Sequence, residues 1–485
     1  MTALAIDEIL FNLSPGETRA ALVSRGRLVE LAIARAARPS LVGNIYLARL
    51  GKVVAGANGA FVELGSGGTG FLPLGEIKAL HDRLGAPMPR SRHPSEGAAA
   101  LMQVVKDATG AKGPQLSAQL ALPGRWLVLT PTRAGVSVSR RIGSIEERRR
   151  LERILAPQLA AGEGVTLRTA AEGVAETALL DELARLRRAW AMLLDRARAA
   201  TPPALIHAEA DVVARVLRDH GGRDLRRVIC DSREALARAA DCLAGLPDSR
   251  IDLQLEPPSS PLFARHDIED QIAAALEPIV ALPSGGRLVI GALEALTAID
   301  VDTARRAGSE RFEDVVLAVN LEAAAEIARQ VRLRNLAGLI VVDFVHMERP
   351  AYRKRVIGAL HAAFADDPLQ VRLGGMTALG LFEMTRKRVR PSLRDMLTAP
   401  CDACEGGGRV RSAEAVAYEL LRAVERMAAA TPGRALTAIA AAAVIAALEG
   451  EAGPARRALE ARLGASIALR ADPQRRREQF EIVTG

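Results

Sequence analysis

The sequence has few cysteines and few aromatic residues, and it has no long hydrophobic run. Four cysteines in 485 residues cannot form the disulfide framework of a secreted protein, so we expect a reducing, cytoplasmic setting. The N-terminus carries acids and lacks the basic and apolar segments of a signal peptide. A mostly alanine stretch between Arg434 and Glu449 is too short to span a bilayer and predicts a buried helix or strand. We therefore expect no membrane anchor.

What the chain does have is length, apolar content and positive charge. Hydrophobic residues make up 49% of the chain, as in globular proteins, and 485 residues exceed one ordinary core. Lysine and arginine number 65 against 57 acids, which gives a formal net charge of +8. A basic surface of this kind suits a polyanionic partner, although it says nothing about the fold. Several domains or subdomains are therefore expected.

Strand and helix patterns divide the chain. Residues 19–23 and 28–33 predict a hairpin or meander, and residues 42–120 predict a small β-barrel with a hairpin loop at GSGGTG and a crossing loop at 85–96. Leucines at helical spacing predict a long helix over 178–200. From residue 285 onward the order strand, helix, strand, helix predicts a mixed α/β layer, followed by a short α/β tail.

Two aspartates each lie at the end of an apolar run, Asp300 in LTAID and Asp343 in GLIVVD. A carboxylate at the end of a buried strand is costly unless its charge is compensated. Mg²⁺ takes oxygen ligands and can activate a bound water, so it is a natural partner. Asp302 lies on the same strand face as Asp300 and could reach the same ion. On spacing alone, helix capping or pairing with arginine explains these acids equally well.

Two phenylalanines face outward from the predicted barrel. Alternation places Ala60, Val62 and Leu64 inside, and Phe61 on the outer face. Phe71 likewise falls opposite Leu72 and Leu74. Bases of single-stranded nucleic acid stack on such rings, while nearby lysines, Lys106 and Lys112, could hold phosphate. The alternative is that the rings pack on a neighbouring domain.

Basic residues form two further candidate sites. Arg168 and Thr169, with Arg140 and Arg141 upstream, could hold a terminal phosphate or could form a structural salt bridge. The run TRKRVR, which contains Arg386 and Arg388, follows an apolar turn. Such a run is usually a solvated face, but it could equally contact a nucleic-acid backbone.

A C-x-x-C motif, Cys401 to Cys404, precedes a glycine-rich turn. This is the form of a zinc knuckle, but it supplies two of the four ligands that tetrahedral zinc needs. Cys230 and Cys242 are too far apart in sequence to supply a second knuckle and are expected to be buried apolar residues. The missing pair could come from a second copy of the chain, or the turn could be free of metal.

Taken together, these motifs resemble the ribonuclease E/G family. The segments AIDVD, NLEAAAEIARQVRLRNLAGLIVVDFVHM, GLFEMTRKRVRPSL and CDAC resemble its catalytic core and zinc link. VGNIYLARLGKVVAGANGAFVELG with GFLPL resembles its S1 domain, and LRTA its 5′-sensor. The chain is closer in length to the ribonuclease G members than to the ribonuclease E members, so we expect no degradosome scaffold tail.

The resemblance implies an α/β multidomain architecture. An RNase H-like subdomain would be split by inserted S1 (OB β-barrel) and 5′-sensor subdomains. A DNase I-like α/β catalytic subdomain, a zinc link and a small α/β C-terminal domain would follow. The implied boundaries are 1–40 and 209–275 (RNase H-like), 41–120 (S1), 121–208 (5′-sensor), 276–398 (DNase I-like), 399–412 (zinc link) and 413–485 (small domain).

The resemblance also implies the activity, a Mg²⁺-dependent endoribonuclease. It would hydrolyse single-stranded RNA in rRNA processing or mRNA decay and be stimulated by a 5′-monophosphate. Zn²⁺ would be shared between two protomers of a homodimer or a higher homo-oligomer. The rival is a catalytically weak or inactive RNA-binding regulator of the same fold. The implied residues are Asp300 and Asp343 for Mg²⁺ with Asp302 as a further ligand, Phe61, Phe71 and Lys112 for RNA, Arg168 and Thr169 with Arg140 and Arg141 for the 5′-phosphate, Arg386 and Arg388 for the backbone, and Cys401 and Cys404 for zinc.

Three positions depart from the pattern that the resemblance implies. Members of the family usually have Asn at the position of Asp302, so this site carries an additional negative charge. They usually have Asp at the position of His346 and Pro at that of Asp402. The stretch 85–101 is also degenerate. These departures favour the rival over the enzyme only weakly.

Overall fold

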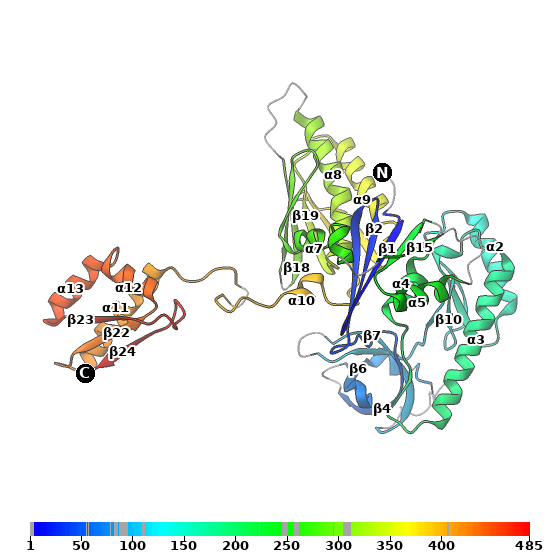
Figure 1. Cartoon of the computed structure of the whole chain (residues 1–485), viewed down its shortest axis with the longest axis horizontal. Coiled ribbons are helices and arrows are strands. Elements are labelled where there is room, and N and C mark those ends of the chain that lie inside the picture. Colours follow the sequence, from blue (N-terminus) through cyan, green and yellow to red (C-terminus); the bar gives the residue numbers. More distant parts are fainter. Residues whose placement is uncertain are drawn as a thin grey trace. The chain divides into compact units, whose positions relative to one another are not determined.

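The computed structural model describes residues 4–485, apart from 55, 57, 78, 82–85, 87–95, 109–111, 223, 245–250, 257–260, 294, 304–311 and 405–406. The predicted loop at 85–96 therefore lies largely outside the described residues. The chain divides into two compact units, Met1–Met396 and Leu397–Gly485 (Figure 1).

A five-stranded sheet joins the two segments expected to form one split subdomain. Its order is β15-β14-β1-β2-β3, with β1 parallel to β14 and antiparallel to β2. Helices α4 and α5 contribute to the same hydrophobic core as these strands. The predicted hairpin is confirmed as β2 and β3, but β1 was not predicted. The bounds are β1 Glu8–Ser14, β2 Glu17–Ser24, β3 Arg27–Arg35, β14 Arg227–Cys230, β15 Asp252–Leu255, α4 Val212–His220 and α5 Arg233–Leu243.

The predicted small barrel is confirmed. Five strands follow one another in the order β4-β5-β6-β8-β7, and β4 pairs with β7 to close the cylinder. Strand β13 adds to β4 from outside. The glycine-rich hairpin loop between β5 and β6 contains the single turn η2. The bounds are β4 Ile45–Val54, β5 Gly59–Glu63, η2 Gly65–Gly67, β6 Thr69–Pro73, α1 Leu74–Ile77, β7 Ala99–Lys106, β8 Gln115–Ser117 and β13 Ala204–His207.

A four-stranded sheet and two long helices form the next layer. The sheet has the order β11-β12-β10-β9. The predicted long helix is α3, which buries the leucines at its helical repeat, Leu179, Leu183 and Leu186. The bounds are β9 Leu122–Pro123, β10 Leu127–Thr130, β11 Gly135–Val138, α2 Ile145–Leu155, η3 Ala156–Gln158, β12 Gly164–Leu167, η4 Thr169–Ala171 and α3 Glu176–Ala199.

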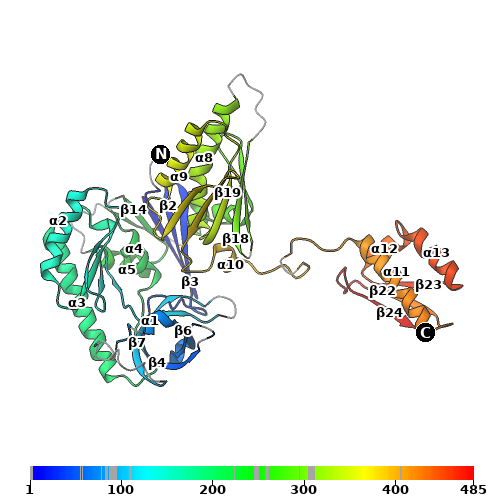
Figure 2. The same cartoon turned by 180° about the vertical axis from the view of Figure 1, so that it is seen from behind.

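The mixed α/β layer predicted after residue 285 is a six-stranded sheet with the order β16-β17-β18-β19-β21-β20. Helices α8 and α9 lie along one face of this sheet (Figures 1 and 2) and share its core. The apolar turn expected before TRKRVR is instead strand β21. The bounds are α6 Leu262–Arg265, α7 Ile268–Leu276, β16 Ile279–Ala281, β17 Arg287–Ala292, β18 Leu296–Asp302, α8 Phe312–Leu333, β19 Gly338–Asp343, α9 Pro350–Ala363, β20 Val371–Met376, β21 Leu381–Arg386 and α10 Leu393–Leu397.

The second unit is a small α/β domain, as expected. Its three strands have the order β23-β22-β24, and three helices complete its core. The alanine-rich stretch forms strand β22, which is mostly buried, and helix α12, which buries one face. Within the described part of the chain, the helices are too short or too polar to cross a membrane. The bounds are α11 Ala413–Ala430, β22 Leu436–Ala440, α12 Ala442–Glu449, α13 Gly453–Leu463, β23 Ile467–Ala471 and β24 Phe480–Thr484.

Candidate functional site

Asp300 and Asp343 lie directly opposite each other on neighbouring parallel strands. The register of β18 and β19 pairs Asp300 with Asp343. Alternation along both strands buries Ile299 and Val342 and leaves both carboxylates on the exposed face. Neighbouring strands are about 4.8 Å apart, so two such carboxylates can share one cation. The sheet thus brings together two acids that are 43 residues apart in the sequence.

The electrostatics of this face favour a cation. Partial burial, followed by the charges of Asp302 and Asp343, raises the pKa of Asp300. The ionised form of Asp300 is therefore destabilised, and a bound cation would relieve that destabilisation. Mg²⁺ fits this donor set, because it accepts one or two carboxylates and keeps several waters.

Asp302 has a different partner from the one expected. Its carboxylate accepts hydrogen bonds from Nε of Arg287 at 2.9 Å and lies 2.8 Å from Nη2 of the same residue. Among the described residues, no three acidic, histidine or cysteine side chains are grouped so as to hold a metal ion. Arg287 thus offsets part of the additional negative charge at position 302. A role for Asp302 as a further metal ligand stays a prediction.

The two barrel phenylalanines form one aromatic surface. Phe61 and Phe71 are paired across β5 and β6, and their ring centroids are 6.0 Å apart in an edge-to-face arrangement. Phe61 is 50% exposed, whereas Ala60 and Val62 are fully buried, as alternation predicted. A side chain at Gly59 would place its Cβ 2.3 Å from Cζ of Phe71, so this glycine makes room for the ring.

The surroundings of this aromatic surface differ from the prediction at one residue. Leu72 is buried as expected, but Leu74 is 42% exposed because it begins helix α1 instead of continuing the strand. The backbone N–H of Phe71 donates to the carbonyl of Pro114 at 2.8 Å. This bond places the segment of Lys112, which is exposed, next to the aromatic strand. Lys106 ends β7 and is half-buried.

Arg168 and Thr169 follow strand β12 and lie next to the 124–126 loop. The N–H of Arg168 donates to the carbonyl of Trp126 at 2.8 Å, and its Nη1 donates to the carbonyl of Gly124 at 2.9 Å. The Thr169 hydroxyl is 3.0 Å from that of Ser139. The residue after Ser139 is the exposed Arg140, so the structure brings the two predicted segments of this pocket together.

Arg168 also forms an ion pair whose partner sequence reasoning did not identify. Its Nη1 lies 2.9 Å from Oδ1 of Asp219, in the last turn of α4. Nothing in the local sequence distinguishes Asp219 from other polar residues at a helix end. The structural salt bridge weighed as an alternative for Arg168 is therefore present, together with the features of a phosphate pocket.

A buried carboxylate fixes the loop that holds Arg168. Glu182 of α3 is 5% exposed, and its carboxylate accepts the backbone N–H groups of Arg125, Trp126 and Leu127 at 2.8–2.9 Å. A Cβ at Gly124 would lie 2.7 Å from Cδ of Glu182, so only glycine fits there. Sequence reasoning missed Glu182, which looks like an ordinary polar residue of a long helix.

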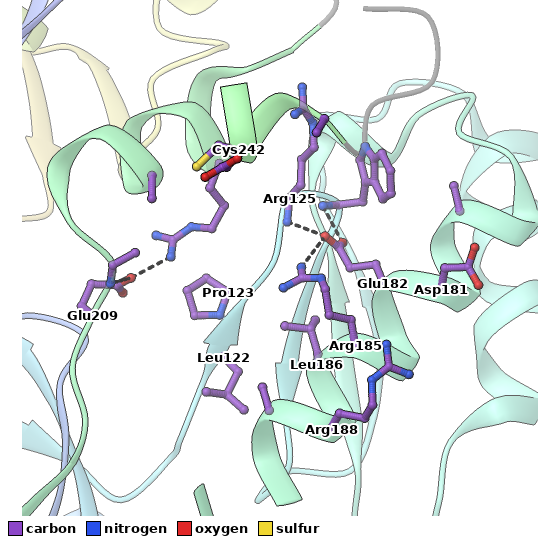
Figure 3. A pocket seen from close by; sticks show the side chains of 18 of the residues that line it. Leu122, Pro123, Arg125, Asp181, Glu182, Arg185, Leu186, Arg188, Glu209 and Cys242 are labelled. Atoms are coloured by element: carbon purple, nitrogen blue, oxygen red, sulfur yellow. Dashed lines mark hydrogen bonds and ion pairs between the residues drawn. The ribbon is translucent and has the colours of Figure 1, made fainter. Parts of the chain in front are cut away.

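Glu182 borders a cavity of about 1040 Å³ between α3 and the α4–α5 region. Figure 3 shows its carboxylate between the backbone of Arg125 and the side chain of Arg185, which donates to it at 3.2 Å. The wall carries both charged and apolar groups, so the cavity has no single chemical character. Cys242 lines it and is exposed, whereas Cys230 is fully buried; the expectation of burial was thus wrong for Cys242.

The expectation that Arg386 contacts RNA is contradicted by its burial. Arg386 is 4% exposed, and its Nε donates to the Asp367 carboxylate at 2.9 Å. Its Nη1 donates to Asn335 and to the carbonyl of Leu336. The alternation of β21 turns this residue toward the core. Its role is structural, because a buried guanidinium with a full set of partners cannot reach a phosphate.

Arg388 and Arg141 differ from Arg386 in being exposed. Arg388 donates to the carbonyl of Ala337 at 3.0 Å. Arg141 donates to the carbonyl of Asp367, the residue whose carboxylate holds Arg386. Arg141 therefore connects the region before α2 to the segment between α9 and β20, and the RNA contact predicted for Arg141 and Arg388 stays a prediction.

The cysteine pair forms a turn suited to metal binding. Cys401 is exposed, and Cys404 accepts the N–H of Gly408 on its sulfur at 3.3 Å. The backbone N–H groups of Ala403 and Cys404 lower the pKa of the Cys401 thiol, which favours the thiolate that binds metals. The pKa of Cys230 is shifted in the other direction, because burial raises it to about 12 and so disfavours the thiolate.

Comparison with known proteins identifies relatives along nearly the whole chain. Residues 121–389 match the model of the ribonuclease E/G family, and residues 400–485 match that of the thioredoxin-like domain of RNase E/G. Ribonuclease G of Escherichia coli (strain K12) is 36% identical over 98% of this chain and 99% of its own length. Ribonuclease G of Haemophilus influenzae is 36% identical over 87% of both chains. Ribonuclease E of Nostoc sp. is 37% identical over 80% of this chain and 57% of its own length.

The raised pKa of Asp300 predicts a change in stability. Without metal, Asp300→Asn should raise the thermal unfolding midpoint at pH 7 by about 1–2 °C, because it removes a repelled charge. A carboxyl whose pKa is raised in the folded state lowers the stability of the fold as pH rises from its pKa in the unfolded state to its pKa in the folded state. The gain should therefore shrink as pH falls and Asp300 becomes protonated.

Differential scanning fluorimetry in EDTA and in Mg²⁺ measures this effect. Mg²⁺ should stabilise the unmodified protein more than the Asp300→Asn variant. Glu383→Gln, on the same exposed face in β21, is the matched control and should respond to Mg²⁺ like the unmodified protein. Equal Mg²⁺ responses in all three proteins would contradict a cation site at Asp300.

Proposed function

The chain belongs to the ribonuclease E/G family, and from that premise we propose that it is a Mg²⁺-dependent endoribonuclease acting on single-stranded RNA. The observation that carries the proposal is the register of Asp300 with Asp343, which places two carboxylates side by side on the open face of the sheet. The names of the relatives support the reaction class.

Asp300 and Asp343 would hold the metal ion. Bound there, Mg²⁺ supplies an activated water and neutralises charge at the phosphodiester. Arg287 keeps Asp302 engaged, which limits the negative charge that an incoming phosphate meets. The attack of water would leave a 5′-phosphate and a 3′-hydroxyl.

RNA would be held on two surfaces away from the metal. Bases stack on the exposed ring of Phe61 and on Phe71, with Lys112 close to the backbone. The 5′-terminal phosphate binds at Arg168 and Thr169, with the exposed Arg140 nearby. Single strands fit this arrangement, because only unpaired bases can stack on a side chain.

The second candidate is an RNA-binding regulator of the same fold without turnover. Asp302 favours this regulator, since the family pattern has the neutral residue Asn at that position. The ion pair of Asp302 with Arg287 weakens that argument, because Arg287 offsets part of the additional negative charge near Asp300. If Asp300 and Asp343 bound no metal ion, their mutual repulsion would also lower the stability of the fold without serving a function.

Asp300→Ala and Asp343→Ala should each abolish cleavage while leaving RNA affinity largely unchanged. Each variant removes a metal ligand but leaves the aromatic surface intact. The measurement is gel analysis of a single-stranded oligonucleotide together with fluorescence anisotropy of binding. Glu383→Ala, an acid on the same face but out of register with the pair, is the control and should cut RNA. Cleavage that survives in either aspartate variant rules out the two-aspartate mechanism.

A 5′-monophosphate should speed cleavage over a 5′-hydroxyl, and Arg168→Ala should remove the difference. The contact is charge-assisted and contributes about 1.5–3 kcal/mol, roughly tenfold or more in rate at low substrate. Initial rates on two oligonucleotides that differ only in the 5′ end test this. Equal rates on both substrates with the unmodified protein would mean that the pocket does not sense the phosphate.

We further propose that Cys401 and Cys404 bind zinc jointly with the same pair of a second protomer. Two thiolates per chain supply half of a tetrahedral site, and the lowered pKa of Cys401 suits a ligand. Asp402 stands where the family has proline, which leaves both ligands in place. The active protein would then be a homodimer or a higher homo-oligomer.

Metal analysis should therefore find half a zinc per chain, lost together with the dimer in Cys404→Ser. The variant removes one of two thiolates, so four-coordination cannot be completed. Elemental analysis and light scattering measure the two quantities. Cys242→Ser, an exposed cysteine in the other compact unit, is the matched control. A full zinc per chain, or a stable dimer free of metal, would show that the assembly is different.

A further inference from the structure

The guanidinium that the proposed function assigns to the 5′-phosphate already holds an anion. Nη1 of Arg168 lies 2.9 Å from Oδ1 of Asp219 and donates to the Gly124 carbonyl at 2.9 Å. Asp219 lies in α4, which shares a hydrophobic core with β1–β3, whereas Arg168 follows β12 in the next layer. The ion pair thus joins two subdomains at the proposed phosphate pocket.

Four charged side chains form one group at Arg168, and Arg125 and Arg215 add positive charge beside it. Nε of Arg218 lies 3.2 Å from Oδ1 of Asp219, and Nη1 of Arg218 lies 2.7 Å from Oε1 of Glu209. Two guanidinium groups therefore face two carboxylates, and this group of four carries no net charge. Burial alone would raise the pKa of Asp219, but Arg218 and Arg168 lower it below its ordinary value. Asp219 accordingly stays ionised at neutral pH.

Arg168 nevertheless keeps an edge for a phosphate. In the part of the chain that the structure describes, its Nε and Nη2 have no hydrogen-bond partner. Arginine binds phosphate through two parallel N–H bonds, and the Nε–Nη2 edge offers such a pair. A terminal phosphate and Asp219 would then share one guanidinium, and each anion would weaken the binding of the other.

We propose that Asp219 is a specificity-determining residue that competes with the RNA 5′-phosphate for Arg168. It sets how strongly a phosphorylated end is preferred. This inference rests on the proposed function of Arg168. It goes beyond that function, because the preference for a 5′-phosphorylated end then depends on Asp219, which lies in a different subdomain from Arg168. A phosphate bound at Arg168 would also loosen the 2.9 Å ion pair between Arg168 and Asp219 of α4.

A purely structural role for Asp219 predicts something different. If the carboxylate only orients Arg168, an asparagine, whose side-chain oxygen also accepts from a guanidinium, should behave like the unmodified residue. If the charge competes with phosphate, asparagine should bind phosphorylated ends more tightly. Asp219→Ala removes both the charge and the acceptor, so it separates orientation from charge.

The test measures KM and kcat on two oligonucleotides that are identical except for a 5′-phosphate or a 5′-hydroxyl. Asp219→Asn should lower KM for the phosphorylated oligonucleotide about threefold to fivefold relative to the hydroxyl one. The same change should appear in equilibrium binding measured by anisotropy in EDTA. The control is Asp195→Asn, which removes the same charge from an exposed pair with Arg198, at 2.7 Å. It should change the preference for the phosphorylated oligonucleotide neither in KM nor in equilibrium binding.

The outcomes separate this inference from the proposed function. The ratio that decides is the KM for the phosphorylated oligonucleotide divided by the KM for the hydroxyl one. If Asp219→Asn leaves this ratio unchanged or raises it, while the unmodified protein clearly prefers a 5′-phosphate, the competition is overturned and the sensor stays intact. Equal binding of both ends by the unmodified protein and by Arg168→Ala overturns the sensor itself. Tighter binding of phosphorylated ends by Asp219→Asn in a protein that cuts no RNA supports the competition and rejects the nuclease.

Discussion

The register between β18 and β19 is the constraint on which the rest of this structure depends. In that register Asp300 faces Asp343, and the residues before them, Ile299 and Val342, are buried under α8 and α9. A slip of one residue in either strand would turn a carboxylate into the core. The hydrophobic packing of the covered face therefore fixes the geometry of the charged face.

The first unit contains two charged regions, one at Asp300 and one at Arg168, and they differ in how far neighbouring charges offset them. Around Asp300 the repulsion from Asp302 and Asp343 is only partly offset by Arg287, so the site retains an excess of negative charge that a cation can satisfy. Around Arg168 the carboxylate of Asp219 offsets the guanidinium. The first region therefore favours a cation, whereas in the second a further anion would compete with Asp219 for Arg168.

Local patterns predicted much of this fold, and contacts between distant segments explain what they missed. Alternation placed Phe61 outside the barrel, and two apolar runs singled out Asp300 and Asp343, because both signals lie within a few residues. Only the family resemblance assigned the two aspartates to one metal ion. The burial of Arg386 depends on Asp367, which is 19 residues away, and Glu182 and Asp219 act on partners more than 50 residues away. No local pattern contains such pairings, nor does any pattern give the register of two strands.

The central claim is that the acid pair of the catalytic sheet cuts single-stranded RNA with the help of Mg²⁺. The most direct measurement is gel analysis of a 5′-monophosphorylated, unstructured oligonucleotide incubated with the unmodified protein in Mg²⁺ and in EDTA. The account predicts internal cleavage products in Mg²⁺ and intact RNA in EDTA. RNA that is bound but stays intact in Mg²⁺, or that is cut equally well in EDTA, would contradict it.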